Sequence, residues 1–151
     1  MKRTCVAFMM IAFLFVVSTS ATAEKGGIRP SDVAGQPTAF CKVLKEPDSI
    51  LLGGWEGVHI NFWKGKSAHD PVQFFLKKYG DQYAIYFYRS KEHGGGKDMR
   101  GWRKFTINGN LMDSGTGIRL FAENGEVFFS YERGAKEKPT KLTLIPGSES
   151  W

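Results

Sequence analysis

Cysteine is scarce in this chain, and so is histidine. The 151 residues include two cysteines and three histidines. Cys5 lies in an N-terminal apolar stretch, so only Cys41 remains if that stretch is removed, and an intramolecular disulfide is then excluded. A lone thiol is either buried, where it packs as a small hydrophobic group, or pairs between chains. We favour burial.

Long apolar runs are equally scarce, and the one that stands out is at the N-terminus. Lys2 and Arg3 precede an apolar stretch over residues 6–17, and Ala-Thr-Ala follows at 21–23. This pattern predicts a secretory signal peptide over residues 1–23, cleaved after Ala23. A retained membrane anchor is the alternative, but about a dozen apolar residues fall short of the ~20 that span a bilayer. We therefore expect an exported protein, periplasmic or extracellular, without a membrane span.

Charge of one sign is also limited. Removal of Lys2 and Arg3 lowers the formal net charge from +6 to +4. Such a small excess is not typical of nucleic-acid binding. Basic and aromatic residues do mix over residues 100–105, but a surface strand gives the same pattern. We expect no nucleic-acid partner.

The side chains of common catalytic and metal sites are not clustered. His59, His69 and His93 fall in different expected elements, without metal-ligand spacing, so we expect no metal and no cofactor. Ser114 lies in a glycine-containing turn that lacks the G-x-S-x-G pattern of a nucleophile elbow. Glycines 94–96 lack the Lys and Ser/Thr of a phosphate-binding loop. These observations favour a protein that is not an enzyme.

The chain is instead rich in aromatic and β-branched residues, in short runs. From residue 55 onward no window has the 3.6-residue period of an amphipathic helix. Tight hairpin turns are expected at 79–82, 108–109 and 124–125, where Gly, with Asn in the last two, tolerates positive φ. Expected strands cover 55–63, 71–79, 82–90, 99–107, 110–113, 117–122, 125–132 and 139–145.

Consecutive strands with short turns predict the fold class. We expect an all-β domain over residues 50–151, an antiparallel up-and-down β-barrel of about eight strands, because closure removes exposed sheet edges. A two-sheet sandwich is the alternative, and it would need a long crossover. Residues 24–49, rich in Gly, Pro and charge, are expected to form a flexible leader with a short turn.

A short motif opens the first expected long strand. Leu52-Gly53-Gly54-Trp55-Glu56-Gly57, after a short helical turn, resembles the Gly-x-Trp first-strand motif of the lipocalins and their calycin relatives. It is also similar to the opening of bacterial nitrobindin-like barrels. The resemblance implies an eight-stranded barrel with a cup for a small ligand, and Trp55 packed across its floor. Nitrobindin-like proteins hold haem through a late histidine, and no histidine follows His93.

The strand expected at 55–63 has two possible inward faces. If it is regular and Trp55 points inward, His59 and Asn61 also point inward, where polar groups need partners and would mark a ligand contact. A bulge at Gly57 would instead bury the apolar residues of the other face, Val58, Ile60 and Phe62. The apolar count favours the bulge.

The expected function is binding of a small apolar or amphipathic ligand without catalysis. The expected binding residues are four aromatic wall residues and two polar anchors: Trp55, Phe74, Tyr86 and Phe129, with His59 and Arg119. The alternative is a filled barrel that acts as an envelope protein–protein interaction module through exposed Trp63, Trp102 and Trp151. An enclosed aromatic-lined space favours the ligand, and a packed interior with exposed tryptophan favours the protein partner.

Overall fold

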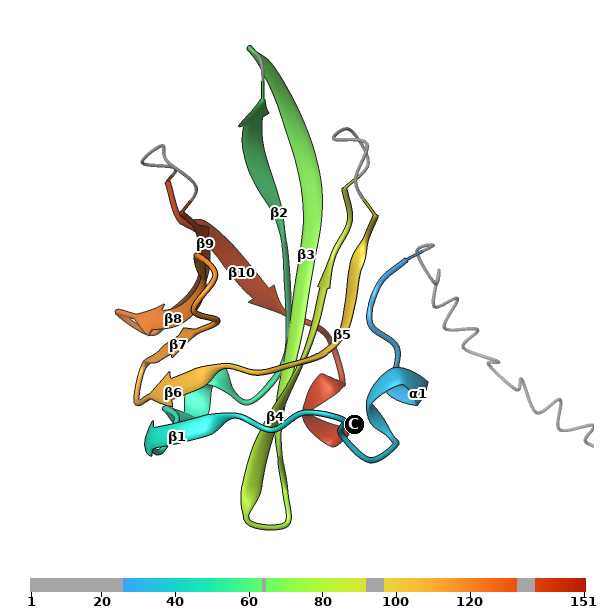
Figure 1. Cartoon of the computed structure of the whole chain (residues 1–151), viewed down its shortest axis with the longest axis vertical. Helices are drawn as coiled ribbons and strands as arrows, with labels where there is room; N and C mark the ends of the chain where they lie inside the picture. Colours follow the sequence, from blue (N-terminus) through green and yellow to red (C-terminus); the bar gives the residue numbers. More distant parts are fainter. Residues whose placement is uncertain (1–25, 64, 92–96, 133–137) are drawn as a thin grey trace, which may run out of the picture.

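The computed structural model describes residues 26–63, 65–91, 97–132 and 138–151, and the side chain of Trp63 is not among the described atoms. The expected signal peptide and the glycine loop at 94–96 therefore lie outside the described residues. In the described residues the chain is all-β, with ten strands and three short helical turns. The mostly antiparallel sheet curls into an open half-barrel (Figure 1).

The elements follow one another with short connections. The helical turns are α1 (Pro30–Val33), η1 (Ser49–Leu51) and η2 (Ser148–Ser150). The strands are β1 (Lys42–Lys45), β2 (Gly53–Trp63), β3 (Lys66–Tyr79), β4 (Gln82–Arg89), β5 (Met99–Arg103), β6 (Thr106–Asn108), β7 (Leu111–Asp113), β8 (Ile118–Glu123), β9 (Glu126–Tyr131) and β10 (Thr140–Leu144).

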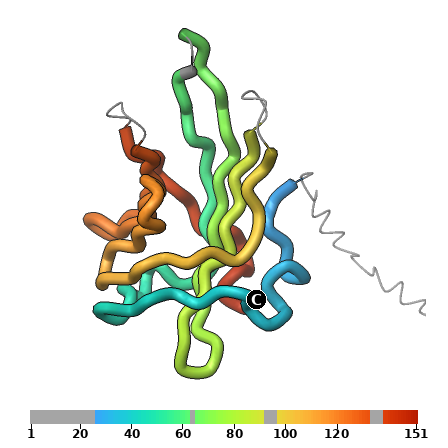
Figure 2. Tube along the Cα trace, viewed as in Figure 1, coloured from blue at the N-terminus to red at the C-terminus, as the bar shows by residue number. Residues whose placement is uncertain are grey.

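The sheet order is β1-β6-β7-β8-β9-β10-β2-β3-β4-β5, and only the β1–β6 pair is parallel. Strands β2 to β5 rise together in Figure 2, with β6 to β10 to one side. β10 joins the two groups, because it pairs with β9 at one end and with β2 at the other.

The expected turns and most strand positions are confirmed. Gly80, Gly109 and Gly125 have φ values of 65°, 62° and 76°, and Asn124 has φ of 50°, which is the left-handed conformation that two-residue hairpin turns require. The strand expected at 99–107 is divided into β5 and β6, and β1 adds a further strand. The described chain therefore has ten strands where the sequence predicts about eight.

The bulge hypothesis for β2 is wrong. β2 and β3 pair without interruption from Gly53 opposite Leu76 to Trp63 opposite Lys66. Gly57 has a different role, because a Cβ there would lie 2.7 Å from Leu142 Cδ2 and 3.1 Å from the Lys141 carbonyl oxygen. The glycine lets β10 approach β2 closely.

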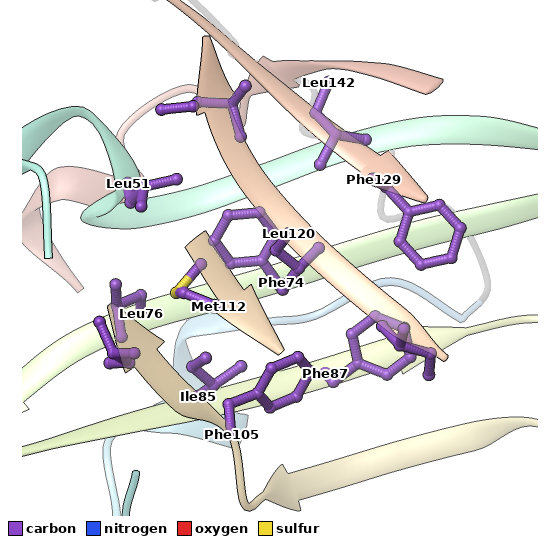
Figure 3. Close-up of a cluster of buried hydrophobic side chains, with 14 of the residues drawn as sticks. Leu51, Phe74, Leu76, Ile85, Phe87, Phe105, Met112, Leu120, Phe129 and Leu142 are labelled. Carbon is purple, nitrogen blue, oxygen red and sulfur yellow. The ribbon is translucent and has the colours of Figure 1, made fainter. Parts of the chain in front are cut away.

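The interior of the half-barrel is a single apolar cluster. It gathers side chains from β2–β4 and β6–β10, and its largest members interlock around Phe74, Phe87 and Phe129 (Figure 3). The rings of Phe87 and Phe129 stack with centroids 6.2 Å apart. Trp55 and Cys41, each partly buried, pack against this interior cluster.

A second cluster covers the opposite face of β3 and β4. Phe75, Tyr86 and Tyr88 are buried there under Ile28 and Val33 of the N-terminal segment, with Trp102 and Trp151 packed against them. We call this group the flank cluster. The segment 24–49, expected to be a flexible leader with a short turn, thus contains α1 and β1 and ends at the start of η1, and its apolar side chains at 28 and 33 are buried.

Candidate functional site

Four of the six expected binding residues meet in the interior. Trp55 on β2 lies directly across from Phe74 on β3. His59 is the second inward-facing residue after Trp55 along β2. Its ring contacts that of Phe129 on β9 edge-on, with ring centroids 5.0 Å apart. Its Nδ1 lies 3.1 Å from the Thr140 hydroxyl oxygen. The regular register of β2 explains why Trp55 and His59 share a face.

These residues pack against one another. His59, Phe74 and Phe129 are each 0% exposed. A side chain with no exposed area borders no space that holds a water molecule, whether outside the protein or enclosed within it. Around these three residues the interior is therefore filled by side chains.

A buried ion pair extends the interior toward the end of the half-barrel where His59 lies. Asp70 is directly across from His59, and both are buried. Arg89 Nη2 and Nε donate to Asp70 Oδ2 at 2.7 and 3.2 Å, and the guanidinium lies 4.6 Å from the centroid of the Tyr131 ring. The two charges compensate each other, which is the condition for burial of charged groups.

The indole N–H of Trp55 is a buried donor in the interior. No acceptor for its Nε1 is found among the described residues. A buried indole N–H usually finds a hydrogen-bond partner. An additional acceptor beside this atom would therefore be stabilised.

The other two expected binding residues lie elsewhere. Tyr86 belongs to the flank cluster, where Trp102 contacts it edge-on at 5.2 Å between centroids. Arg119 is partly exposed and pairs with Asp113 at 3.1 Å and Glu132 at 2.8 Å. Gly115 N–H also donates to Asp113, and this hydrogen bond is the main cause that lowers the pKa of that carboxyl. Arg119 and Tyr86 therefore do not join the interior residues.

The expected tryptophan anchors of the alternative function are in part covered. Trp151 stacks on Phe75 with centroids 5.8 Å apart, and Trp102 contacts Tyr79 edge-on as well as Tyr86. Both are half-buried in the flank cluster. The side chain of Trp63 is not described.

Three apolar residues that the bulge hypothesis placed in the interior are exposed. Val58, Ile60 and Phe62 are 51%, 46% and 69% exposed, on the face of β2 that points away from the interior. We call residues 58–62 the distal segment of β2. The signal was present in the alternation of the strand, because a regular strand with Trp55 inward must turn these three outward.

The edge of β2 that faces away from β3 is accompanied by β10 as far as His59. β10 is paired with β2 at Trp55 and Glu56, and a Cβ at Gly57 would lie 3.1 Å from the Lys141 carbonyl oxygen. The Thr140 hydroxyl oxygen lies 3.1 Å from His59 Nδ1. The β2–β3 hairpin rises beyond the neighbouring strands at this end (Figure 1), and it carries Val58, Ile60 and Phe62 on its outward face.

Other chemistry is limited in the part of the chain that the structure describes. No group of three or more His, Cys, Asp or Glu side chains is placed to hold a metal ion there. Likewise, no helix among these residues is long and apolar enough to cross a membrane. Burial raises the pKa of the Cys41 thiol to about 11, so the thiol is protonated at neutral pH.

Comparison with known proteins adds no relative. No protein-family model, no curated protein and no solved structure matches the chain.

Proposed function

We propose that this protein is a non-catalytic binding module that acts through its surface, at the distal segment of β2. The observation that carries the proposal is the row of exposed Val58, Ile60 and Phe62 on the outward face of β2. We further propose that it is exported, because residues 1–23 have the pattern of a signal peptide.

An extended segment is the kind of partner that fits this surface. Alternate side chains of such a segment can contact the exposed face of the strand. Val58, Ile60 and Phe62 supply such alternate contacts, since they share one face of the strand. The expected target is therefore an extended segment with apolar residues at every second position.

The packed interior supports a surface function over an apolar cup. The residues that would line a cup, His59, Phe74 and Phe129 among them, are fully covered by other side chains. A scaffold of this kind resembles a closed barrel in its connectivity, because β5 and β6 are separated by only two residues and β10 pairs with β2. We propose that it is a lipocalin-like barrel whose interior serves stability.

A small amphipathic ligand is the second candidate, and one observation favours it. Trp55 Nε1 is buried without an acceptor among the described residues, and the buried Asp70–Arg89 pair lies in the same half-barrel. Native mass spectrometry of protein purified from its own source tests this candidate. A bound small molecule that a Trp55→Phe variant no longer retains supports it, and protein free of small molecules argues against it.

Peptide selection tests the main proposal. A library of displayed random peptides is selected for binding to the wild-type protein, and peptides that also bind the Ile60→Lys variant are removed. Because the side chain at this position is exposed, we expect the fold of the variant to be unchanged. We expect enriched peptides with alternating apolar residues, and amide shifts in residues 58–62 on titration. The proposal would be contradicted if no enriched peptide binds the wild type in preference to the variant.

A further inference from the structure

The first described residues of the chain lie on the outer face of the sheet without joining it. We call residues 26–34, which include α1, the strap. The strap contains no strand, so ladder hydrogen bonds do not hold it in place. It lies outside the half-barrel, beside β5 (Figure 1). Its Ile28 and Val33 side chains are 6% and 1% exposed, because they are buried in the flank cluster.

Side chains of β3 bind the backbone of the strap. Ile28 N–H donates to Gln73 Oε1, and the Val33 carbonyl accepts from the Tyr79 hydroxyl at 2.8 Å. Buried backbone groups outside a ladder need partners of this kind. The sheet therefore holds the strap as a peptide-binding site holds a peptide, with apolar contacts for two side chains and polar contacts for the backbone between them.

Two glycines begin the strap, and the site requires them. Gly26 has a φ of 122°, and a Cβ there would lie 2.4 Å from Tyr88 Oη. A Cβ at Gly27 would lie 3.0 Å from the polar atoms of the Gln73 amide. Arg100 Nη2 donates to the carbonyl oxygens of both glycines. The site thus selects glycine at the first position and a small residue at the second.

An acidic residue completes the pattern. Asp32 Oδ2 lies 3.5 Å from Arg100 Nη1, and the Arg100 guanidinium lies 5.2 Å from the centroid of the Tyr88 ring. Arg100 therefore contacts the strap at its start and, through Asp32, next to its second buried apolar residue. The full pattern is glycine, a small residue, an apolar residue, four residues of which the last is acidic, and a second apolar residue.

We propose that this part of the outer face is a peptide-binding site, which the strap closes by binding as a ligand within the same chain. The ligand from another protein is a short segment with the pattern of the strap, and it binds only while the strap is displaced. The site uses residues of β3, β4 and β5 and none of residues 58–62. The inference is therefore independent of the function proposed for the distal segment.

The attachment of the strap sets the expected affinities. Two buried apolar side chains and a few hydrogen bonds predict weak binding of a separate segment, with a dissociation constant on the order of 100 μM. A strap joined to its site has an effective concentration of about 1 mM. A site whose strap has been released should therefore bind the segment about tenfold more tightly than the wild-type protein does.

A variant that releases the strap tests the site without altering it. Ile28→Ser combined with Val33→Ser removes both apolar contacts of the strap and leaves every residue of the sheet in place. The probe is a synthetic peptide of residues 26–36, and the fluorescence of Trp102 and Trp151 follows its binding. We expect binding to this variant near 100 μM and binding to the wild type that is about tenfold weaker. The control peptide carries the same two serines and should bind neither protein.

Amide hydrogen exchange of the wild-type protein gives an independent measurement. Ile28 N–H is bonded to Gln73, and Asp32 N–H and Ala34 N–H are bonded within the strap. We expect these three amides to exchange at least about tenfold faster than the amides that pair β3 with β4, through an opening that leaves the sheet folded.

Each result decides the proposal. A folded variant that does not bind the peptide would overturn it, as would equal binding of the peptide and its control, or equal binding by the variant and the wild type. If the variant does not fold, hydrogen exchange decides. Strap amides that exchange only when the β3–β4 amides do would show that the strap is an inseparable part of the core, and the site would not exist.

Discussion

The two halves of β2 belong to one strand and differ in what surrounds them. The proximal half, residues 53–57, lies between β3 and β10, and Gly54 N–H donates to the buried Ser148 hydroxyl at 2.9 Å. The distal segment is paired with β3 throughout and meets β10 at His59, whose Nδ1 lies 3.1 Å from the Thr140 hydroxyl oxygen. The interior face remains buried in both halves, because His59 is 0% exposed while Ile60 beside it is 46% exposed.

This difference shows that backbone regularity and burial are separate matters. The register with β3 is continuous through both halves, so the exposure of the distal segment does not come from a distorted strand. It comes from the outward direction of Val58, Ile60 and Phe62, which lie outside the flank cluster. The proximal half and the interior should therefore respond to substitution as a core does, and the outward side chains of the distal segment should not.

The largest expected effect compares two phenylalanines. Phe129→Ala removes a ring that is 0% exposed and contacts His59 and Phe87, and we expect it to lower the free energy of unfolding by about 3–5 kcal/mol. Phe62→Ala, at 69% exposure, should change it by about 0.5 kcal/mol or less. Urea unfolding followed by circular dichroism measures both. Equal losses would remove the distinction between interior and distal segment.

A second comparison concerns ion pairs. Asp70→Asn leaves the buried Arg89 charge uncompensated, and we expect a loss of about 3 kcal/mol. Asp113→Asn weakens a pair whose side chains are 42% and 34% exposed, and exposed pairs contribute about 0–1 kcal/mol. Unfolding at pH 7 compares them. If Asp70→Asn is as mild as Asp113→Asn, the interior at the level of His59 is not closed to water.

Thiol reactivity gives the next comparison. The raised pKa of Cys41, about 11 because of burial, leaves a thiolate fraction at pH 8 about a hundredfold below that of an ordinary thiol. A cysteine introduced by Phe62→Cys should react with iodoacetamide at the ordinary rate. Mass spectrometry resolves the two sites within one protein. Similar rates at both would contradict the burial of Cys41.

The smallest effect concerns glycines. A Cβ at Gly54 would lie 2.9 Å from Ser148 Cβ, so we expect Gly54→Ala to destabilise the protein by about 1–2 kcal/mol through overpacking. Gly35, which has no atom within 4 Å of such a Cβ, is the control, and Gly35→Ala should be neutral or slightly stabilising. Midpoints of thermal unfolding suffice. A neutral Gly54→Ala would show that η2 packs loosely on the proximal half.

Local signals in the sequence predicted much of this structure. Gly and Asn at the tight turns located the hairpins, because few other residues adopt positive φ. The all-β class and the antiparallel sheet followed from them. The inward face of β2 was predicted wrongly, because the number of apolar residues favoured the face that is exposed. Whether other elements cover the outer face of a strand is a long-range property that no local pattern contains.

The site residues were predicted less completely for a similar reason. β4 is buried on both faces, with seven of its eight residues buried, so alternation could not tell that Tyr86 faces the flank cluster. The cover over that cluster comes from Ile28 and Val33, in a segment whose composition resembles a linker. Its four-residue helix is too short to leave a periodic signal.

Titration of the protein with a selected peptide, followed by NMR along β2, tests the central claim most directly. We expect amide shifts that cluster at residues 58–62 in the wild type and that are lost in Ile60→Lys. Shifts that fall on other elements, or shifts at residues 58–62 that Ile60→Lys retains, would contradict the proposed binding surface.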